Sequence, residues 1–456
     1  MAEHEVAQGS LRTARTTLRA LAAGACAGLA VAALAACTPP GSGLPAVSEI
    51  APTNVSTDLG SGPIELTLYD GAGLKAIDEA LISAFTKKHP NVTIKGRYDP
   101  DDVQAQNAPR VLSSNEPPDI ARVIALSDVV QDKLLTNLDA YADAYDWDQL
   151  PKGQLSQYRV NQDGVRGEGP QYTVASGFTV TGFYYNKDLA KRVGMTTQPK
   201  TLEEFEALLA KAKDAGLVPI MAGNQTGGVV FPLQMLLNQT LGAEKINDWV
   251  FHAPGATINA PEATEAVAKV STWAKAGYFP TDTNGTDATQ AVGRFAKGEG
   301  LFLASGNWDA ASLEKQMGDN VGFFLPPAGN GGKPATMSDP VSNFGIPARA
   351  DQKDAAAAFL DFMRSDEARQ IVVDAGFAPS GSGATPVSKP GSVTAEVQEA
   401  FAQLVEADGQ VQFVQNATNG INAAWNPEIQ RLVAGATSAE DLLATVQKKY
   451  EEELGR

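Results

Sequence analysis

A change in hydrophobic period near residue 70 is the sequence feature that most constrains the fold. Apolar residues alternate with other residues over Ile64–Tyr69, which is typical of a strand, and Asp70–Gly73 is typical of a turn. From Leu74 to Phe85 the apolar residues recur at helical spacing, and a second strand is expected over Val92–Ile94. Two strands joined through a helix form a βαβ unit, so this part of the sequence predicts an α/β fold with parallel strands.

The same alternation of strands and helices recurs further along the chain. Thr201 and Glu204 have the spacing of a capping box, and an apolar stripe at helical spacing follows them. A strand is expected next over Val218–Ile220. Two helices are expected late in the chain, over Ala355–Met363 and Glu367–Val373. The α/β pattern therefore extends over most of the chain.

The amino-terminal segment has the organisation of an export signal. Three arginines precede the apolar stretch Leu21–Ala36, as in a charged region followed by an apolar region. The alternative is an uncleaved membrane anchor, but about 16 apolar residues are short for a bilayer span of roughly 20. The stretch ends in Leu34-Ala35-Ala36-Cys37, which resembles the lipobox of bacterial lipoproteins, whereas Cys26 lacks the large aliphatic residue three positions before it.

This reading divides the first part of the chain into two segments. Residues 1–36 are predicted to be a lipoprotein signal peptide, and Cys37 is the predicted site of lipidation. Residues 37–61 are rich in Pro, Gly, Ser and Thr, which favours a flexible tether. We therefore expect a protein body that is held to a membrane by an amino-terminal lipid.

Composition excludes several classes of function. The formal net charge of -17 argues against binding to nucleic acid, which clusters of Lys and Arg would favour. Two Cys and three His leave no multi-thiolate zinc site and no disulfide framework, so no metal or cofactor is expected. The stretch Asp282–Asp287 hints at a calcium loop but lacks the required Gly and Glu, so a helix cap is favoured there.

Several segments, taken in their order and spacing, resemble the extracellular solute-binding proteins of ABC importers, in particular the carbohydrate-binding group that includes the maltodextrin-binding protein. The resemblance covers nearly the whole chain after the signal. It rests on Phe85–Val92, Pro118–Ile120, Phe183–Leu189, Pro199–Phe205, Phe295–Trp308 and Ala355–Arg369.

The resemblance implies a two-lobed α/β fold of the periplasmic-binding-protein type, with a hinge and a cleft between the lobes. Lobe one is expected to comprise residues 62–173 and 327–376, and lobe two residues 178–321 and 382–456. The connections are expected at 174–177, 323–326 and 378–382.

The resemblance also implies the function. The expected protein is a monomer that captures a sugar between its lobes and delivers it to the permease subunits of an ABC importer, at the outer face of the cell membrane, without catalysis. Two alternatives stay open: the same fold with a polyamine, phosphate ester or peptide as its solute, and a secreted glycoside hydrolase that uses two carboxylates. Aromatic candidates with few charged ones favour a neutral sugar.

A sugar site needs flat aromatic surfaces and planar polar groups that bind pairs of hydroxyls. Trp308 is the leading candidate, because the resemblance places a ring-stacking Trp at this position, and core packing is its alternative role. The alternative role of Trp425 is core packing, that of Asp70 is helix capping, and that of Arg122 is a surface salt bridge. For the remaining candidates the alternatives are turn or core roles. The chain lacks an aromatic residue near Arg122, where several relatives have one. The full set of candidates is Asp70, Asp119, Arg122, Asn224, Gln225, Phe231, Trp308, Asp309, Asn343, Phe344 and Trp425.

Overall fold

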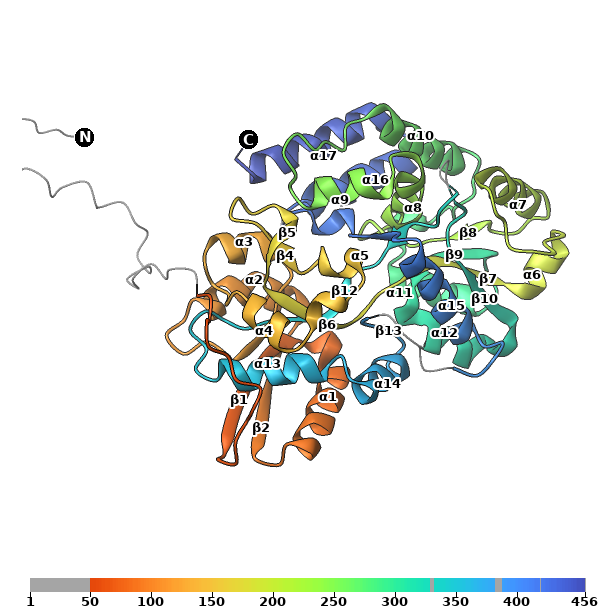
Figure 1. Cartoon of the computed structure of the whole chain (residues 1–456). Coiled ribbons are helices and arrows are strands. Elements are labelled where there is room, and N and C mark those ends of the chain that lie inside the picture. Colours follow the sequence, from red (N-terminus) through yellow and green to blue (C-terminus); the bar gives the residue numbers. More distant parts are fainter. Residues whose placement is uncertain (1–49, 329–331, 382–387, 419, 456) are drawn as a thin grey trace, which may run out of the picture. The chain divides into compact units, whose positions relative to one another are not determined.

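A computed structural model describes residues 50–328, 332–381, 388–418 and 420–455. The described residues belong to one compact unit (Figure 1). The predicted signal peptide, Cys37 and the first part of the tether lie outside them. No helix within the described ranges is long and apolar enough to cross a membrane.

Six strands form the sheet of the first lobe. In spatial order β13-β6-β12-β3-β1-β2, they are Ala378–Pro379, Thr173–Phe178, Pro340–Gly345, Ile120–Arg122, Ile64–Gly71 and Val92–Asp99. Strand β1 is parallel to both β2 and β3, which confirms the predicted βαβ unit. Strand β12 is antiparallel to β3 and to β6.

Helices cover both faces of this sheet, because alternate residues of each strand face opposite sides. Leu66 and Leu68 of β1 belong to one apolar core, whereas Tyr69 belongs to a second core on the other face. The first core is covered by helices α1 (Lys75–Lys88), α13 (Lys353–Phe362) and α14 (Asp366–Asp374). Helices α2 (Asp101–Leu112) and α3 (Leu126–Gln131) contribute to the second. The remaining elements of this lobe are η1 (Ala72–Leu74), α4 (Asp139–Ala144), η2 (Trp147–Gln149), α5 (Lys152–Leu155), β4 (Arg159–Val160) and β5 (Arg166–Gln171).

Four strands form the sheet of the second lobe. In spatial order β10-β7-β9-β8, they are Val321–Phe324, Thr181–Asn186, Phe302–Gly306 and Ile220–Met221. One face packs on the largest apolar core, together with α7 (Leu202–Asp214), α8 (Val230–Thr240), α9 (Ala243–Val250), α10 (Pro261–Lys275), α16 (Asn422–Val433) and α17 (Ala439–Glu453). The other face packs on α11 (Ala288–Ala296), α12 (Ala310–Met317) and α15 (Val393–Glu406). Helix α6 (Lys187–Arg192) follows β7, and the short helices are η3 (Thr283–Gly285), η4 (Asn307–Asp309), η5 (Gly318–Asn320) and η6 (Val414–Asn416).

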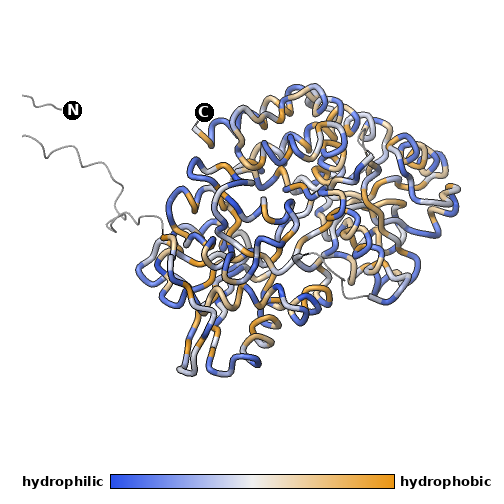
Figure 2. The backbone as a smooth tube through the Cα atoms, viewed as in Figure 1, coloured by the Kyte–Doolittle hydropathy of each residue, from blue (hydrophilic) through white to orange (hydrophobic). Residues whose placement is uncertain are grey.

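The outer helices are amphipathic. In Figure 2 their turns alternate between hydrophobic and hydrophilic colours. Helix α7, for example, buries Phe205, Leu208, Leu209 and Ala212, the stripe predicted from the sequence. Its predicted cap is confirmed, because the Thr201 side chain accepts a hydrogen bond from the Glu204 amide at 3.2 Å.

Other sequence predictions for local structure also hold. The helices expected at Ala355–Met363 and Glu367–Val373 correspond to α13 and α14. The strand expected over Val218–Ile220 begins two residues later, as β8.

The chain passes three times between the two sheets. Strand β6 belongs to the first sheet and β7 to the second, so the first passage falls between Phe178 and Thr181, just after the expected connection at 174–177. The second runs from β10 to β12 through β11 (Thr336–Met337), which pairs with β14 (Gln410–Val411). The third follows β13. The precise lobe boundaries stay a prediction.

The first passage brings the two sheets edge to edge. Three residue steps from Phe178 to Thr181 span at most about 10 Å of extended chain. Thr181 pairs with Gly306 at the end of β9, and Phe178 pairs with Pro340 at the start of β12. Since β12 is antiparallel to β3, Pro340 lies beyond the carboxyl end of β3. The loops that follow β1, β3, β8 and β9 therefore face one another across the hinge.

Candidate functional site

An aromatic cluster lies on the second lobe at this edge. Trp308, in η4 directly after β9, is 39% exposed and is the larger of two exposed bulky apolar residues among the described residues. Its ring centroid is 6.0 Å from that of Phe231 on α8 and 6.5 Å from that of Phe413, which follows β14. Phe231 and Phe413 are 6.0 Å apart in an edge-on arrangement. These three residues form what we call the aromatic platform.

Glycine at position 306 permits this placement of Trp308. A Cβ atom added to Gly306 would lie 2.1 Å from Cζ3 of the Trp308 ring. The indole therefore packs directly on the main chain of β9. The next residue, Asp309, accepts hydrogen bonds from the side chains of Ser305 and Trp308, and burial raises the pKa of its carboxyl group. Asp309 thus helps to hold Trp308 of the platform in position.

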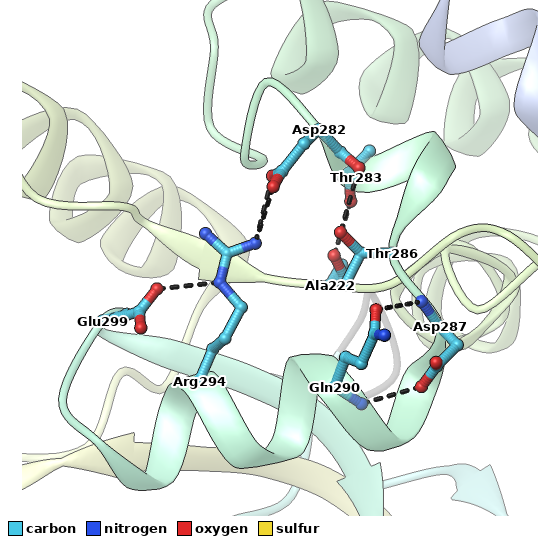
Figure 3. A network of polar contacts seen from close by, with 8 residues as sticks. All are labelled: Ala222, Asp282, Thr283, Thr286, Asp287, Gln290, Arg294 and Glu299. Atoms are coloured by element: carbon cyan, nitrogen blue, oxygen red, sulfur yellow. Dashed lines mark hydrogen bonds and ion pairs between the residues drawn. The ribbon is translucent and has the colours of Figure 1, made fainter.

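The loop after β8 is held by a polar network, which Figure 3 shows. Thr283 donates a hydrogen bond from its hydroxyl to the Ala222 carbonyl, and the Asn224 amide donates to the Thr283 carbonyl at 2.7 Å. Asp287 forms a capping box with Gln290 at the start of α11, which confirms the helix cap expected there. Asp282 pairs instead with Arg294, at 3.0 Å. Within the described residues, no group of three or more His, Cys, Asp or Glu is arranged to hold a metal ion.

Two predicted residues, Asn224 and Gln225, lie in this loop. Asn224 is fully buried, and its side chain bonds to Asn284 and to the Val229 amide. Gln225 is exposed, and its carbonyl accepts a hydrogen bond from Gln430 at 2.7 Å. Asn224 therefore shapes the loop, whereas the Gln225 side chain extends from it.

The first lobe contributes a polar edge. Asp70 is the penultimate residue of β1, and Arg122 is the last residue of β3, its neighbour in the sheet. The Arg122 guanidinium lies 3.3 Å from Asp70, with 22% of the Arg122 side chain exposed and none of the Asp70 side chain. Asn343 donates to the Val123 carbonyl at 3.2 Å and so holds the segment that follows Arg122. The structure thus brings three predicted residues together.

Asp119 lies away from this edge. It precedes β3, at the amino end of the strand, where its carboxylate accepts hydrogen bonds from the Thr67 amide and hydroxyl and from the Gln352 amide. These bonds join β1 to the turn before α13. The structure therefore gives Asp119 a structural role at the opposite end of the sheet.

Phe344 and Trp425 lie in the apolar cores. Phe344 is fully buried in the first-lobe core, 6.5 Å from Phe359. Trp425 is fully buried in the second-lobe core, 6.4 Å from Trp249 in an edge-on contact. Neither side chain has surface to offer a ligand, so the packing alternative holds for both. Each side chain is buried because of the face of its strand or helix on which it lies. Proximity to a loop in the sequence does not determine that face.

A cavity of about 240 Å³ is lined by segments of both lobes. One wall is the segment 124–128, directly after β3 and its Arg122, together with Ala105 of α2. The opposite wall is formed by the segment 415–418, which begins two residues after Phe413, and by Asn422 at the start of α16. Arg166, Val250 and His252 complete the lining.

Two residues of this lining carry a polar atom without a hydrogen-bond partner. Asn422 Oδ1 and Arg166 Nε are buried without a hydrogen-bond partner among the described residues. The Arg166 guanidinium lies over the Phe251 ring at 4.8 Å and donates to the Gln157 carbonyl at 3.2 Å. Its burial lowers the pKa to about 10. Buried polar groups without partners are uncommon in folded proteins, so these two atoms require an explanation.

Two titratable residues, Asp128 and His252, line the same cavity. Burial raises the pKa of the Asp128 carboxyl on α3, while the charge of His252 lowers it. His252 has a positive φ of 66° and its Nε2 contacts the Ala417 carbonyl at 2.5 Å. The cavity therefore has polar as well as apolar lining residues.

Sequence reasoning missed several residues of this region. Phe413 and Arg166 lie within or beside short strands and have the pattern of ordinary strand residues, so only the fold reveals them. Asn422 lies three residues before Trp425 on α16. The sequence pointed to Trp425 as the binding residue of these two, but Trp425 is buried and Asn422 lines the cavity.

Comparisons with known proteins agree with this architecture. A family model described as bacterial extracellular solute-binding protein matches residues 70–370. Among solved structures, a chitin oligosaccharide binding protein has a TM-score of 0.69 at 19% identity and covers 86% of this chain and 100% of its own. A family 1 extracellular solute-binding protein from Bifidobacterium longum subsp. infantis has a TM-score of 0.70 at 22% identity, with coverage of 86% and 100%.

Two further similar proteins have names that mention sugars. The solute-binding protein RafE in complex with raffinose has a TM-score of 0.66 at 19% identity, covering 86% of this chain and 99% of its own. A probable sugar-binding periplasmic protein of Mesorhizobium japonicum is 27% identical over 133 residues, or 28% of this chain. That match spans 30% of the relative's length. The structural likenesses, all below 25% identity, show the two-lobed fold.

Proposed function

Since the chain belongs to the family of bacterial extracellular solute-binding proteins, we propose that its solute is a neutral sugar, held between the two lobes. The observation that carries this proposal is the exposed face of Trp308 on the aromatic platform. Sugar rings present C–H faces that pack on aromatic rings, and an exposed tryptophan in a rigid cluster offers such a surface.

The cavity lined by both lobes supports the proposal. Asn422 and Arg166 line it, and Asn422 Oδ1 and Arg166 Nε, which are buried in this structure, lack hydrogen-bond partners that a sugar hydroxyl would supply. Arg122, which pairs with the buried Asp70, adds a planar polar group on the first lobe. At about 240 Å³, the cavity is smaller than sites of about 300–1,000 Å³ that enclose drug-sized ligands. We therefore expect it to hold one ring of a ligand that continues over the platform.

The names of the relatives point to the same class of ligand. A chitin oligosaccharide binding protein and a raffinose complex are among the similar structures, and the curated relative is described as sugar-binding. We infer that the chain is the monomeric capture component of an ABC importer. It acts outside the cytoplasm, without catalysis, and hands its ligand to the permease subunits. Closure of the lobes on the ligand is the signal that a membrane partner can recognise. We further infer that a lipid on Cys37 holds it to the outer face of the membrane.

A thermal-shift screen tests the sugar proposal. The panel is raffinose, maltose, chitotriose and xylotriose, with spermidine and amino acids as charged controls. A ligand that binds only the folded state adds about 2.7 kcal/mol at one hundred times its dissociation constant, which raises the melting temperature by a few degrees. A saturable shift with a neutral sugar is expected. A shift only with a charged control would overturn the sugar assignment.

A further inference from the structure

Two carboxyl groups are completely buried beside the first-lobe edge. Asp70, near the end of β1, and Asp78, on α1, have no exposed surface. Acidic residues are almost never fully buried unless they are paired. Asp70 faces the same side of the sheet as Leu66 and Leu68, because alternate residues of a strand share a face. Helix α1 packs on that side, so Asp70 points towards Asp78 rather than into the cleft.

Each carboxyl group has its own partners on one oxygen. Asp70 Oδ1 contacts the Gly71 amide and the Arg122 guanidinium. Asp78 Oδ1 accepts a hydrogen bond from the Ser342 hydroxyl at 2.8 Å, and Ser342 has a positive φ of 45° that turns it towards α1. The two carboxyl groups also lie close enough for the charge of Asp70 to raise the pKa of Asp78. Each Oδ2 is buried and has no hydrogen-bond partner in the described part of the chain.

A hydrogen bond between the two Oδ2 atoms would satisfy both, and it requires a proton on one carboxyl group, since ionised carboxylates only accept. Two ionised carboxylates in contact within a buried site would also repel each other strongly. With one proton the pair carries a single negative charge, which the positive charge of Arg122 balances. With no proton, a buried negative charge would be left over.

We propose that Asp70 and Asp78 share one proton between their Oδ2 atoms, and that this singly charged pair positions Arg122 at the edge of the sugar cleft. Asp78 is therefore a positioning residue for a site that it does not line. The pair also keeps the edge electrically neutral, which suits a neutral sugar. The positioning role rests on the proposed function, whereas the shared proton does not.

The surrounding groups agree with this assignment. Burial raises the pKa of both carboxyl groups, and the charge of Asp70 raises that of Asp78 further, while Arg122 on β3 opposes both shifts. On β2, Tyr98 is the titratable group that faces the pair, and its pKa is raised by burial and then by Asp78, Glu79 and Asp70. Lys75 of α1 lies over the Tyr98 ring at 5.6 Å.

The direction of the pH effect follows from these shifts. A carboxyl pKa raised by folding means that the folded protein holds a proton that the unfolded chain has released. The unfolding free energy contributed by the pair therefore falls as pH rises above the ordinary carboxyl value of about 3.9. It stops falling above the raised pKa.

Denaturant unfolding of the full chain between pH 4 and pH 8 tests the shared proton. Asp78→Asn replaces the shared proton with a permanent N–H donor. Relative to this variant, the folded-to-unfolded ratio of the wild type is expected to fall by up to tenfold per pH unit in part of this range. Parallel pH profiles would overturn the proposal. Ser342→Ala is the matched control, because it leaves both carboxyl groups in place and retains the wild-type slope.

Infrared spectroscopy of the wild-type protein needs no variant. A carbonyl band from a protonated carboxyl group is expected at pH 7, and its absence would overturn the shared proton. This measurement decides the matter even if Asp78→Asn does not fold.

Titration with raffinose, maltose and chitotriose tests the positioning role. Asp78→Ala is expected to weaken sugar binding at least tenfold, whereas Asp78→Asn stays within threefold of the wild type. Equal affinities in all three proteins, or an equal loss in both variants, would overturn the positioning role. If the wild type binds none of these sugars, the proposed function and the positioning role fail together, and the pH profiles still decide the shared proton.

Discussion

The indole ring of Trp308 lies 6.0 Å from the ring of Phe231, centroid to centroid, with 54° between their planes. The two residues come from η4 and α8, and Phe413 completes the cluster from the segment after β14. Three separate parts of the second lobe thus fix one aromatic surface at the edge that faces the first lobe. A surface held in this way loses little conformational entropy when a ligand packs on it.

Trp308→Ala is expected to remove sugar binding without unfolding the protein. The side chain is 39% exposed, so its loss should change the unfolding free energy by about 1 kcal/mol or less. Loss of the stacking surface should weaken binding by about tenfold or more, equivalent to about 1.4 kcal/mol. Calorimetric titration and chemical denaturation measure the two effects. A strongly destabilised variant would show that Trp308 is a core residue instead.

Trp425→Ala, in contrast, is expected to destabilise the folded protein strongly. This side chain is fully buried against Trp249, so its removal should lower the unfolding free energy by about 3–5 kcal/mol. The comparison with Trp308→Ala uses the same chemical change at two sites. Equal stability of the two variants in urea unfolding would contradict the assignment of their roles.

Gly306→Ala should weaken binding through Trp308. The new methyl group would lie 2.1 Å from the indole, so the ring has to move off the main chain of β9. Gly293→Ala is the matched control, since no atom lies within 4 Å of a Cβ there and the residue is within α11. The control should keep its affinity and gain about 0.5–1 kcal/mol of stability. Unchanged affinity in Gly306→Ala would show that the ring position is unimportant.

Asn422→Ala should weaken binding with little change in stability, because the unpartnered Oδ1 makes no hydrogen bond that folding would lose. Asn91→Ala serves as the control. Asn91 bonds to the Gly60 and Gly62 carbonyls at the amino end of β2, away from the cavity. Sugar affinities of the two variants decide the role of Asn422, and a loss of equal size in both would refute it.

Asp339 should make stability depend on pH. Burial raises the pKa of its carboxyl group to about 6, although the Phe413 amide, Arg166 and Asn416 each oppose the shift. The folded protein therefore binds a proton that the unfolded chain releases between about pH 4 and pH 6. The unfolding free energy of the wild type should fall over this range more steeply than that of Asp339→Asn. Identical pH profiles in urea unfolding would contradict the raised pKa.

Much of the fold follows from sequence because local signals and tertiary structure agree. The period change after Tyr69 predicted β1 and α1, and Thr201 caps α7 as expected. These features depend on neighbours within a few residues. The parallel pairing of β1 with β2 follows from the helix between them.

The site was predictable only in part, because side-chain direction depends on the tertiary environment. Trp308 and Phe231 lie in contact with each other, whereas Trp425 turns into the core from a helix whose first residue, Asn422, lines the cavity. Asp70 was expected in a loop that faces ligand, but strand β1 continues through it and directs it towards α1. A one-residue difference in where a strand ends changes the face on which a side chain lies.

The most direct test of the central claim is isothermal titration of the protein with raffinose, maltose, chitotriose and xylotriose, repeated for Trp308→Ala. The account predicts one saturable site for at least one of these neutral sugars, with no change in the sugar itself, and at least a tenfold loss of affinity in the variant. Binding of charged solutes alone, or unchanged sugar affinity in Trp308→Ala, would contradict it.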